Sequence, residues 1–92
     1  MLAQPVAYFP PRTETERRLE GIWREVLNMD RVGIEDDFND LGGDSFLAAV
    51  IFGEIEEIFT ITIPMATLLV APSIARLARK VDELVSAREL QP

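Results

Sequence analysis

A serine that follows two glycines and an aspartate is the residue of this chain best placed to take part in chemistry. The segment reads Gly42-Gly43-Asp44-Ser45. The two glycines can adopt backbone conformations closed to other residues, and they leave their neighbours uncovered. Asp44 is a good N-cap, so Ser45 falls in the first turn of a helix, where the helix dipole and free N–H groups favour a phosphate. The segment thus presents a hydroxyl group that a second enzyme can reach, although taken alone it is also an ordinary loop entering a helix.

The chain offers no group of its own that would activate this hydroxyl. It contains neither histidine nor cysteine, so a Ser-His-Asp or Cys-His site cannot be built from it. No Gly-Lys-Ser or Gly-Lys-Thr sequence forms a phosphate-binding loop, and Leu47 stands where a nucleophile elbow needs a glycine. A calcium loop starting at Asp37 would place Leu41 at a ligand position. We therefore predict no catalytic residue and no metal site.

Size and charge limit the remaining classes of function. The chain has 92 residues, which suffice for one domain and not for two. A net charge of −7 leaves no basic footprint for nucleic acid and steers the protein toward basic partners. Residues 1–5 do not form a signal peptide, and the apolar stretch 46–53 is too short to span a membrane. We expect a soluble, cytoplasmic monomer with no nucleic-acid or membrane partner. The start at Met1 and the tail at Pro92 suggest a freestanding protein, although an excised segment would look the same.

Hydrophobic periodicity predicts three main helices and one short one. The first runs from about residue 14 to residue 27 or 28, and its capping box has Thr13 as the cap and Glu16 bonding back to it. The second covers 45–59, an extended link covers 60–63, and a short helix covers 65–69 with Pro64 at its first position. Ser73 caps the last helix. The predicted apolar faces consist of Leu19, Ile22, Trp23, Val26 and Leu27, then Ala48, Ile51, Phe52, Ile55 and Phe59, then Ile74, Leu77, Val81, Leu84 and Val85.

These elements predict an all-α fold, a four-helix bundle with a long first loop. The loop covers 29–44, and its apolar anchors are Val32, Ile34, Phe38 and Leu41. We divide the chain into a flexible N-terminal lead-in over 1–10, a domain over 11–87 and a C-terminal tail over 88–92. Bundles of this kind are common, so the fold alone says little about function.

The segment from Asp36 to Phe46 resembles the phosphopantetheine attachment motif of carrier proteins, especially the peptidyl carrier (thiolation) domains of nonribosomal peptide synthetases. In that family it reads roughly Asp-x-Phe-Phe-x-Leu-Gly-Gly-Asp/His-Ser-Leu. The matching residues are Asp36, Phe38, Leu41, Gly42, Gly43, Asp44 and Ser45. Asn39 stands where an aromatic residue is common, and Phe46 stands where leucine is usual. The likeness extends over about residues 10–86, through 11–16, 22–27, 63–64 and 71–74.

This resemblance implies an acyl-carrier-protein-like fold and a carrier function. A phosphopantetheinyl transferase would esterify Ser45 with the phosphopantetheine arm of coenzyme A, and Asp44 and Gly43 would belong to the same cofactor-binding corner. The thiol of the arm would carry an aminoacyl or acyl group as a thioester. The implied partners are the transferase, an adenylating or acyl-loading enzyme, and a condensing or other acyl-transfer enzyme. The chain would act as a covalent shuttle and would catalyse nothing itself.

Departures from the peptidyl carrier pattern leave the subtype open. The second helix carries Glu54, Glu56 and Glu57, and an acidic second helix is more like that of fatty-acid and polyketide acyl carriers, which dock on basic patches. A discrete acyl carrier protein is therefore one alternative, and an unmodified helical interaction module is another. We also predict an apolar patch beside the serine that faces partner proteins. Its residues are Phe46, Ala49, Gly53, Met65 and Leu68.

Overall fold

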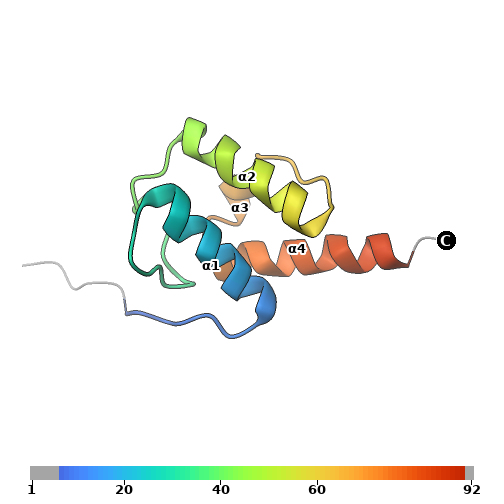
Figure 1. Cartoon of the computed structure of the whole chain (residues 1–92), viewed down its shortest axis with the longest axis horizontal. Coiled ribbons are helices and arrows are strands. Elements are labelled where there is room, and N and C mark those ends of the chain that lie inside the picture. The colour runs from blue at the N-terminus through green and yellow to red at the C-terminus, as the bar shows by residue number, and fades with distance from the viewer. Residues whose placement is uncertain (1–6, 91–92) are drawn as a thin grey trace, which may run out of the picture.

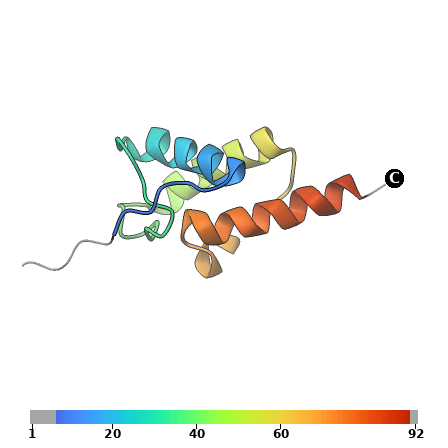
Figure 2. The ribbon, with the colours of Figure 1, turned by 90° about the horizontal axis from the view of Figure 1, so that it is seen from below.

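The computed structural model describes residues 7–90, and within this range the chain forms four α-helices and no β-strand (Figure 1). The helices are α1 (Glu14–Leu27), α2 (Ser45–Phe59), α3 (Thr67–Val70) and α4 (Ile74–Glu89). Helix α1 packs against both α2 and α4. The short α3 lies beside the N-terminal half of α4, on the side away from α1 (Figure 2). The predicted all-α fold with a long first loop is confirmed.

The core forms where the apolar faces of α1, α2 and α4 meet. Trp23 and the loop residue Phe38 lie at its centre, with ring centroids 6.0 Å apart in an edge-to-face arrangement. Most of the predicted faces are buried, namely Leu19, Ile22, Trp23, Ala48, Ile51, Phe52, Ile55, Ile74, Leu77 and Val81. The other predicted residues are only partly buried at the edge of the core, namely Val26, Leu27, Phe59, Leu84 and Val85.

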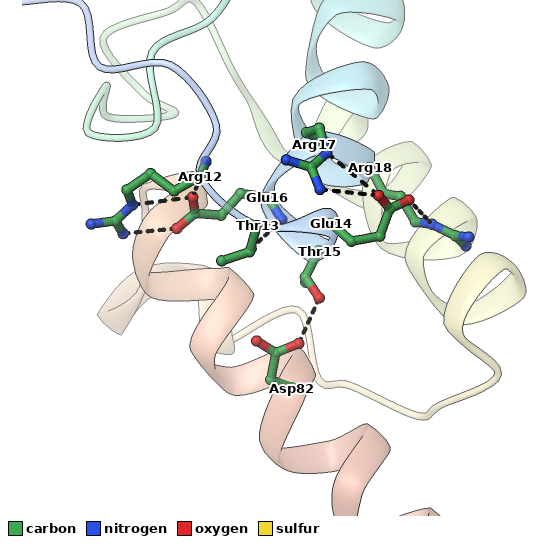
Figure 3. A network of polar contacts seen from close by, with 8 residues as sticks. All are labelled: Arg12, Thr13, Glu14, Thr15, Glu16, Arg17, Arg18 and Asp82. Atoms are coloured by element: carbon green, nitrogen blue, oxygen red, sulfur yellow. Dashed lines mark hydrogen bonds and ion pairs between the residues drawn. The ribbon is translucent and has the colours of Figure 1, made fainter.

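The start of α1 follows the predicted capping pattern on one side only. Thr13 Oγ1 accepts a hydrogen bond from the Glu16 N–H at 3.1 Å, as predicted. The Glu16 carboxylate does not bond back to Thr13. It accepts the N–H of Arg12 at 2.7 Å and pairs with the Arg12 guanidinium at 2.8 Å (Figure 3). The Glu16 carboxylate bonds to Arg12 rather than to Thr13 because Arg12 supplies both a backbone donor and a cation to it.

Further polar contacts involve the first two turns of α1, and one of them reaches another helix. Glu14 pairs with Arg17 and Arg18 along the helix surface (Figure 3). The hydroxyl of Thr15 donates to a carboxylate oxygen of Asp82 at 2.6 Å and so joins α1 to α4.

The long connection between α1 and α2 is fastened to the bundle at several points. Its anchors are Val32, Ile34 and Phe38, which are buried, and Leu41, which is partly buried. The Phe38 N–H donates to the carbonyl of Pro72 at 2.9 Å, and the Ile34 carbonyl accepts the N–H of Ala75 at 2.9 Å. The buried carboxylate of Glu20 accepts the N–H of Val32 at 3.1 Å. The loop is therefore held by both α1 and the start of α4, as its apolar anchors predicted.

The described part of the N-terminal lead-in is also held to this loop. The carbonyl of Phe9 accepts the N–H of Ile34 at 2.9 Å. The guanidinium of Arg31 lies 4.0 Å from the centroid of the Tyr8 ring, a cation–π contact. Residues 7–10 thus have defined contacts with the domain, while the remainder of the expected flexible lead-in, residues 1–6, lies outside the described residues.

The expected boundary at residue 87 does not coincide with the end of the last helix. Helix α4 continues to Glu89, so the first two residues of the expected tail are helical. Arg88 explains the extension, because its Nη1 donates to the carbonyls of Phe59 and Thr60. These carbonyls lie at the C-terminal end of α2, where a helix leaves acceptors without intrahelical partners.

The link from α2 to α3 is extended, as predicted, with Ile63 buried and its N–H bonded to Glu56 at 3.0 Å. Helix α3 itself begins two residues later than the predicted start at Met65. The N–H groups of Thr67 and Leu68 bond three residues back, to Pro64 at 2.9 Å and to Met65 at 3.0 Å. Hydrogen bonds of this spacing form a turn rather than an α-helix. The α-helical part is therefore limited to the single turn Thr67–Val70.

Candidate functional site

Ser45 is the first residue of α2, and its side chain is exposed. Asp44 is the N-cap, as predicted: its carboxylate accepts the Leu47 N–H at 2.9 Å and its carbonyl accepts the Ala48 N–H at 2.9 Å. The N–H groups of Ser45 and Phe46 come before that of Ala48, the first N–H bonded to an acceptor of this helix, so they have no acceptor within the helix. The hydroxyl therefore lies at the positive end of a helix of 15 residues, where a covalently attached phosphate is stabilised.

The double glycine before this helix is required by its geometry. Gly42 has a φ of +92°, a backbone conformation that L side chains rarely adopt. Gly43 has a different constraint, because a Cβ atom there would lie 2.3 Å from the ring of Phe38. The Gly43 N–H also donates to the Phe38 carbonyl at 3.0 Å. Since Phe38 packs on Trp23 in the core, the corner that presents Ser45 rests directly on the centre of the bundle.

The acidic residues before the serine fix turns of the loop. The carboxylate of Asp36 accepts the Gly33 N–H at 2.9 Å, and that of Asp37 accepts the Asn39 N–H at 2.8 Å. Such side-chain-to-backbone bonds are typical of aspartates in turns. No group of three or more carboxylates among residues 7–90 is arranged to hold a metal ion. The acidity of this segment therefore has a structural explanation.

A hollow of about 420 Å³ adjoins the serine. Asp44, Ser45 and Ala48 line it on one side, and α3 with the turn before it lines the other side through Met65 and Leu69. The ring of Phe38 also contributes to the wall. The site thus consists of an exposed hydroxyl, a helix N-terminus and an adjoining, partly apolar hollow.

The residues of the predicted partner patch differ in how far they are exposed. Phe46 is 74% exposed and Met65 is 44% exposed, and Ala49 and Gly53 are also exposed on α2. Leu68 does not fit the prediction, because it is only 8% exposed and packs in the core.

Two neighbours of Leu68 are exposed in its place. Leu69 is 83% exposed and Val70 is 75% exposed. Sequence reasoning could not find this register, because a helix of four residues is too short to show a periodic apolar face.

Comparison with known proteins identifies the family of this chain. Small helical bundles that hold an exposed serine at the start of a helix are the architecture of carrier domains. A family model described as "Phosphopantetheine attachment site" matches residues 17–81. The chain therefore belongs to this family, whose cofactor is covalently attached phosphopantetheine, and it is a carrier domain rather than an enzyme.

Similar segments occur in much longer synthases. The chain is 40% identical over 73 residues to tyrocidine synthase 3 of Brevibacillus parabrevis, covering 79% of the chain and 1% of that protein. It is 44% identical over 79 residues to chondramide synthase cmdD of Chondromyces crocatus, covering 86% of the chain and 2% of that protein. The chain thus spans a very small part of each of these relatives.

Solved carrier structures have the same fold. One is the structure of the phosphopantetheine transferase Sfp in complex with coenzyme A and a peptidyl carrier protein, with a TM-score of 0.80 and 29% identity, covering 83% of this chain and 99% of the matched one. Another is an active-site mutant peptidyl carrier protein, with a TM-score of 0.82 and 28% identity, covering 88% of this chain and 93% of that chain. The predicted peptidyl-carrier-type fold is confirmed.

The residues present suit the cofactor of this family. A phosphodiester on Ser45 would lie beside the first N–H groups of α2, which favour negative charge. A Cβ atom added at Gly42 would meet nothing within 4 Å, so the space around this residue is open. Within the part of the chain that the structure describes, no helix is long and apolar enough to cross a membrane.

Proposed function

We propose that Ser45 is the attachment residue for phosphopantetheine and that the arm carries an aminoacyl or peptidyl group as a thioester during nonribosomal peptide synthesis. The observation that carries the proposal is the exposed Ser45 hydroxyl at the N-terminus of α2. The absence of histidine and cysteine from the chain supports it, because any thiol chemistry here must use an imported group. When attached, the arm supplies the thiol that bears the cargo.

The residues around the serine have distinct tasks in this proposal. Asp44 caps α2 and so fixes the backbone that presents the hydroxyl. The N–H groups of Ser45 and Phe46 stabilise the phosphodiester. Gly43 lets the chain pass over the ring of Phe38 and leaves the hydroxyl accessible to a transferase. None of these groups moves a proton, so the bond-forming steps belong to partner enzymes.

The proposed partners follow from this chemistry and from the relatives. A phosphopantetheinyl transferase attaches the arm, an adenylating enzyme loads it, and a condensing enzyme takes the cargo. The synthetase relatives support the peptide pathway, and the complex of a peptidyl carrier protein with a transferase supports the first step. We propose that the domain acts as a monomer in the cytoplasm, where coenzyme A and ATP are available.

A loading experiment tests the cargo. The chain is converted to the holo form with coenzyme A and a promiscuous transferase. It is then incubated with ATP, pooled amino acids and the adenylation domain encoded nearest to it. The proposal predicts an intact-mass increase by one amino acid that hydroxylamine removes, since a thioester is cleaved by this reagent. No loading by any amino acid, while an acyl-loading enzyme acylates the same arm, would contradict it.

The acyl carrier alternative rests on the charge of α2. Glu54 and Glu57 lie on this helix, and it contains no lysine or arginine. Such a surface suits basic patches on acyl-transfer enzymes. Loading from an acyl ligase with a fatty acid, in place of an amino acid, would favour this second candidate.

A further inference from the structure

The positive charges of this acidic chain are not distributed evenly. Five arginines lie within hydrogen-bond or ion-pair distance of a carboxylate, namely Arg12, Arg17, Arg18, Arg24 and Arg88. Arg31 contacts the Tyr8 ring, and Lys80 lies 3.8 Å from Glu83. Of the arginines and lysines among residues 7–90, only Arg76 and Arg79 have neither an ion pair nor an aromatic partner. Both are exposed on α4.

These two arginines and Lys80 line one groove between α3 and α4. The groove has a volume of about 920 Å³, and α3 lies along it beside the N-terminal half of α4 (Figure 2). Its walls combine the three cations with apolar side chains, among them Val70 and Leu84. Glu83 is the one carboxylate in the lining, and its partner is Lys80.

This groove is separate from the hollow beside Ser45. The two lie on opposite sides of α3: Leu68 and Leu69 line the hollow, whereas Thr67 and Val70 line the groove. No residue is shared between the two linings.

We propose that the α3–α4 groove is a second docking surface, which binds an acidic amphipathic helix of a partner protein. Cations that lack carboxylate partners within the chain gain most from carboxylates supplied by another molecule. Apolar side chains between those cations match the buried face of such a helix. With a net charge of −7, the chain as a whole disfavours acidic partners, so an acidic partner is expected to bind at a local cationic surface such as this groove.

A helix fits these observations better than a small anion does. A built anion site needs donors that converge on one point, whereas Arg76, Arg79 and Lys80 are all exposed on the rim of a large groove. The groove is also partly apolar, and apolar side chains do not contribute to the binding of a free phosphate. Docking here would hold a neighbouring protein close to the arm and leave α2 free for the enzymes that act on the cargo.

Binding of designed peptides to the full chain, followed by amide chemical shifts, tests this proposal. The probe is a helical peptide with leucines on one face and glutamates on the other. Comparison probes are a leucine–lysine peptide, a serine–glutamate peptide and inorganic phosphate. We expect the leucine–glutamate peptide alone to shift the amides of residues 65–71 and 76–84, while those of 45–53 stay unchanged.

Reversing the charge of the two groove arginines tests their role in peptide binding. The double variant Arg76→Glu, Arg79→Glu should weaken peptide binding about tenfold and flatten its salt dependence. Its fold should persist, because both residues are exposed and an acid in the first turn of α4 suits the helix dipole. The control is Arg17→Glu, Arg18→Glu on α1, which changes the net charge equally and should bind as the native chain does.

Several results would overturn the docking surface. One is absence of binding by the leucine–glutamate peptide, and another is shifts that map to α2. Equal weakening in the two charge-reversed variants would mean that only the overall charge matters. Equal shifts caused by phosphate or by the serine–glutamate peptide would mean that the groove recognises negative charge without a helix.

Discussion

Gly43 joins the core of the domain to the exposed Ser45, and contact with Phe38 makes it a tightly constrained residue of the candidate site. An added methyl group would meet the ring of Phe38, which is buried and cannot move without disturbing Trp23. We expect Gly43→Ala to destabilise the domain by about 1–3 kcal/mol, the usual cost of overpacking. Chemical denaturation measures the change. Modification of Ser45 should slow as well, because the displaced corner carries the hydroxyl.

Gly53 provides the matched control for this prediction. It lies exposed within α2, and a Cβ atom there would meet nothing within 4 Å. Gly53→Ala should therefore stabilise the domain by about 0.5–1 kcal/mol, because alanine is the better helix former. If both substitutions changed stability by the same amount in the same direction, contact with Phe38 would not be the reason for glycine at position 43.

Phe46 tests whether the surface beside the serine is used by partners. Its side chain is 74% exposed at the start of α2, so truncation removes little packing from the fold. We expect Phe46→Ala to unfold at nearly the native temperature while its rate of modification or of cargo transfer falls. Thermal unfolding and transferase kinetics measure the two effects. A variant that unfolds, or one that serves every partner at the native rate, would refute this role.

At the level of helices, the start of α1 depends on a single carboxylate. Glu16 is buried and accepts hydrogen bonds from the backbone and side chain of Arg12, and the side-chain bond holds its pKa below the usual value. We expect Glu16→Gln to cost about 1.5–3 kcal/mol at neutral pH, the range for hydrogen bonds to charged groups.

The pH dependence of this effect has a definite sign. A lowered pKa in the folded state means that the fold favours the ionised form, so the stabilisation is complete above the pKa of an unfolded glutamate. It is lost as the pH falls through the lowered folded-state pKa. Unfolding free energies at a series of pH values should therefore show the native chain and Glu16→Gln converging in acid. A gap that stayed constant across this pH range would rule out the charge of Glu16 as its cause.

Sequence reasoning located the long helices but not all of their ends. The bounds of α1 and α2 followed from periodicity and from side-chain caps, which are local signals. The end of α4 depends on Arg88 contacting Phe59, which lies 29 residues away in sequence. The register of α3 likewise depends on packing against the core, which leaves Leu68 buried and Leu69 exposed. Contacts between residues far apart in sequence cannot be predicted from local hydrophobic periodicity.

At the level of the whole molecule, the family and the segment around Ser45 could be recognised from the sequence, whereas the α3–α4 groove could not. The motif around Ser45 is contiguous, so its residue types and spacing could be recognised directly. The steric reason for Gly43 was hidden, because Phe38 reaches it through the fold. The α3–α4 groove was hidden as well, since it needs two helices side by side and knowledge of which arginines are already paired.

The two surfaces suggest a division of labour across the domain. In the proposed function, the N-terminal end of α2 and the adjoining hollow present Ser45 and the attached arm to enzymes. The groove on the far side of α3 carries positive charge and shares none of the residues that line that hollow. A carrier with two separate surfaces can bind one protein through the α3–α4 groove while the arm on Ser45 reacts with another.

The attachment of the arm to Ser45 is the central claim, and intact mass spectrometry tests it most directly. The chain is measured before and after incubation with coenzyme A, magnesium and a promiscuous phosphopantetheinyl transferase, beside Ser45→Ala and Ser86→Ala. Ser86 is an exposed serine on α4 and serves as the matched control. We predict a gain of one phosphopantetheine in the native chain and in Ser86→Ala, and none in Ser45→Ala. A gain that persists in Ser45→Ala, or no gain in the native chain while a known carrier is modified, would contradict the claim.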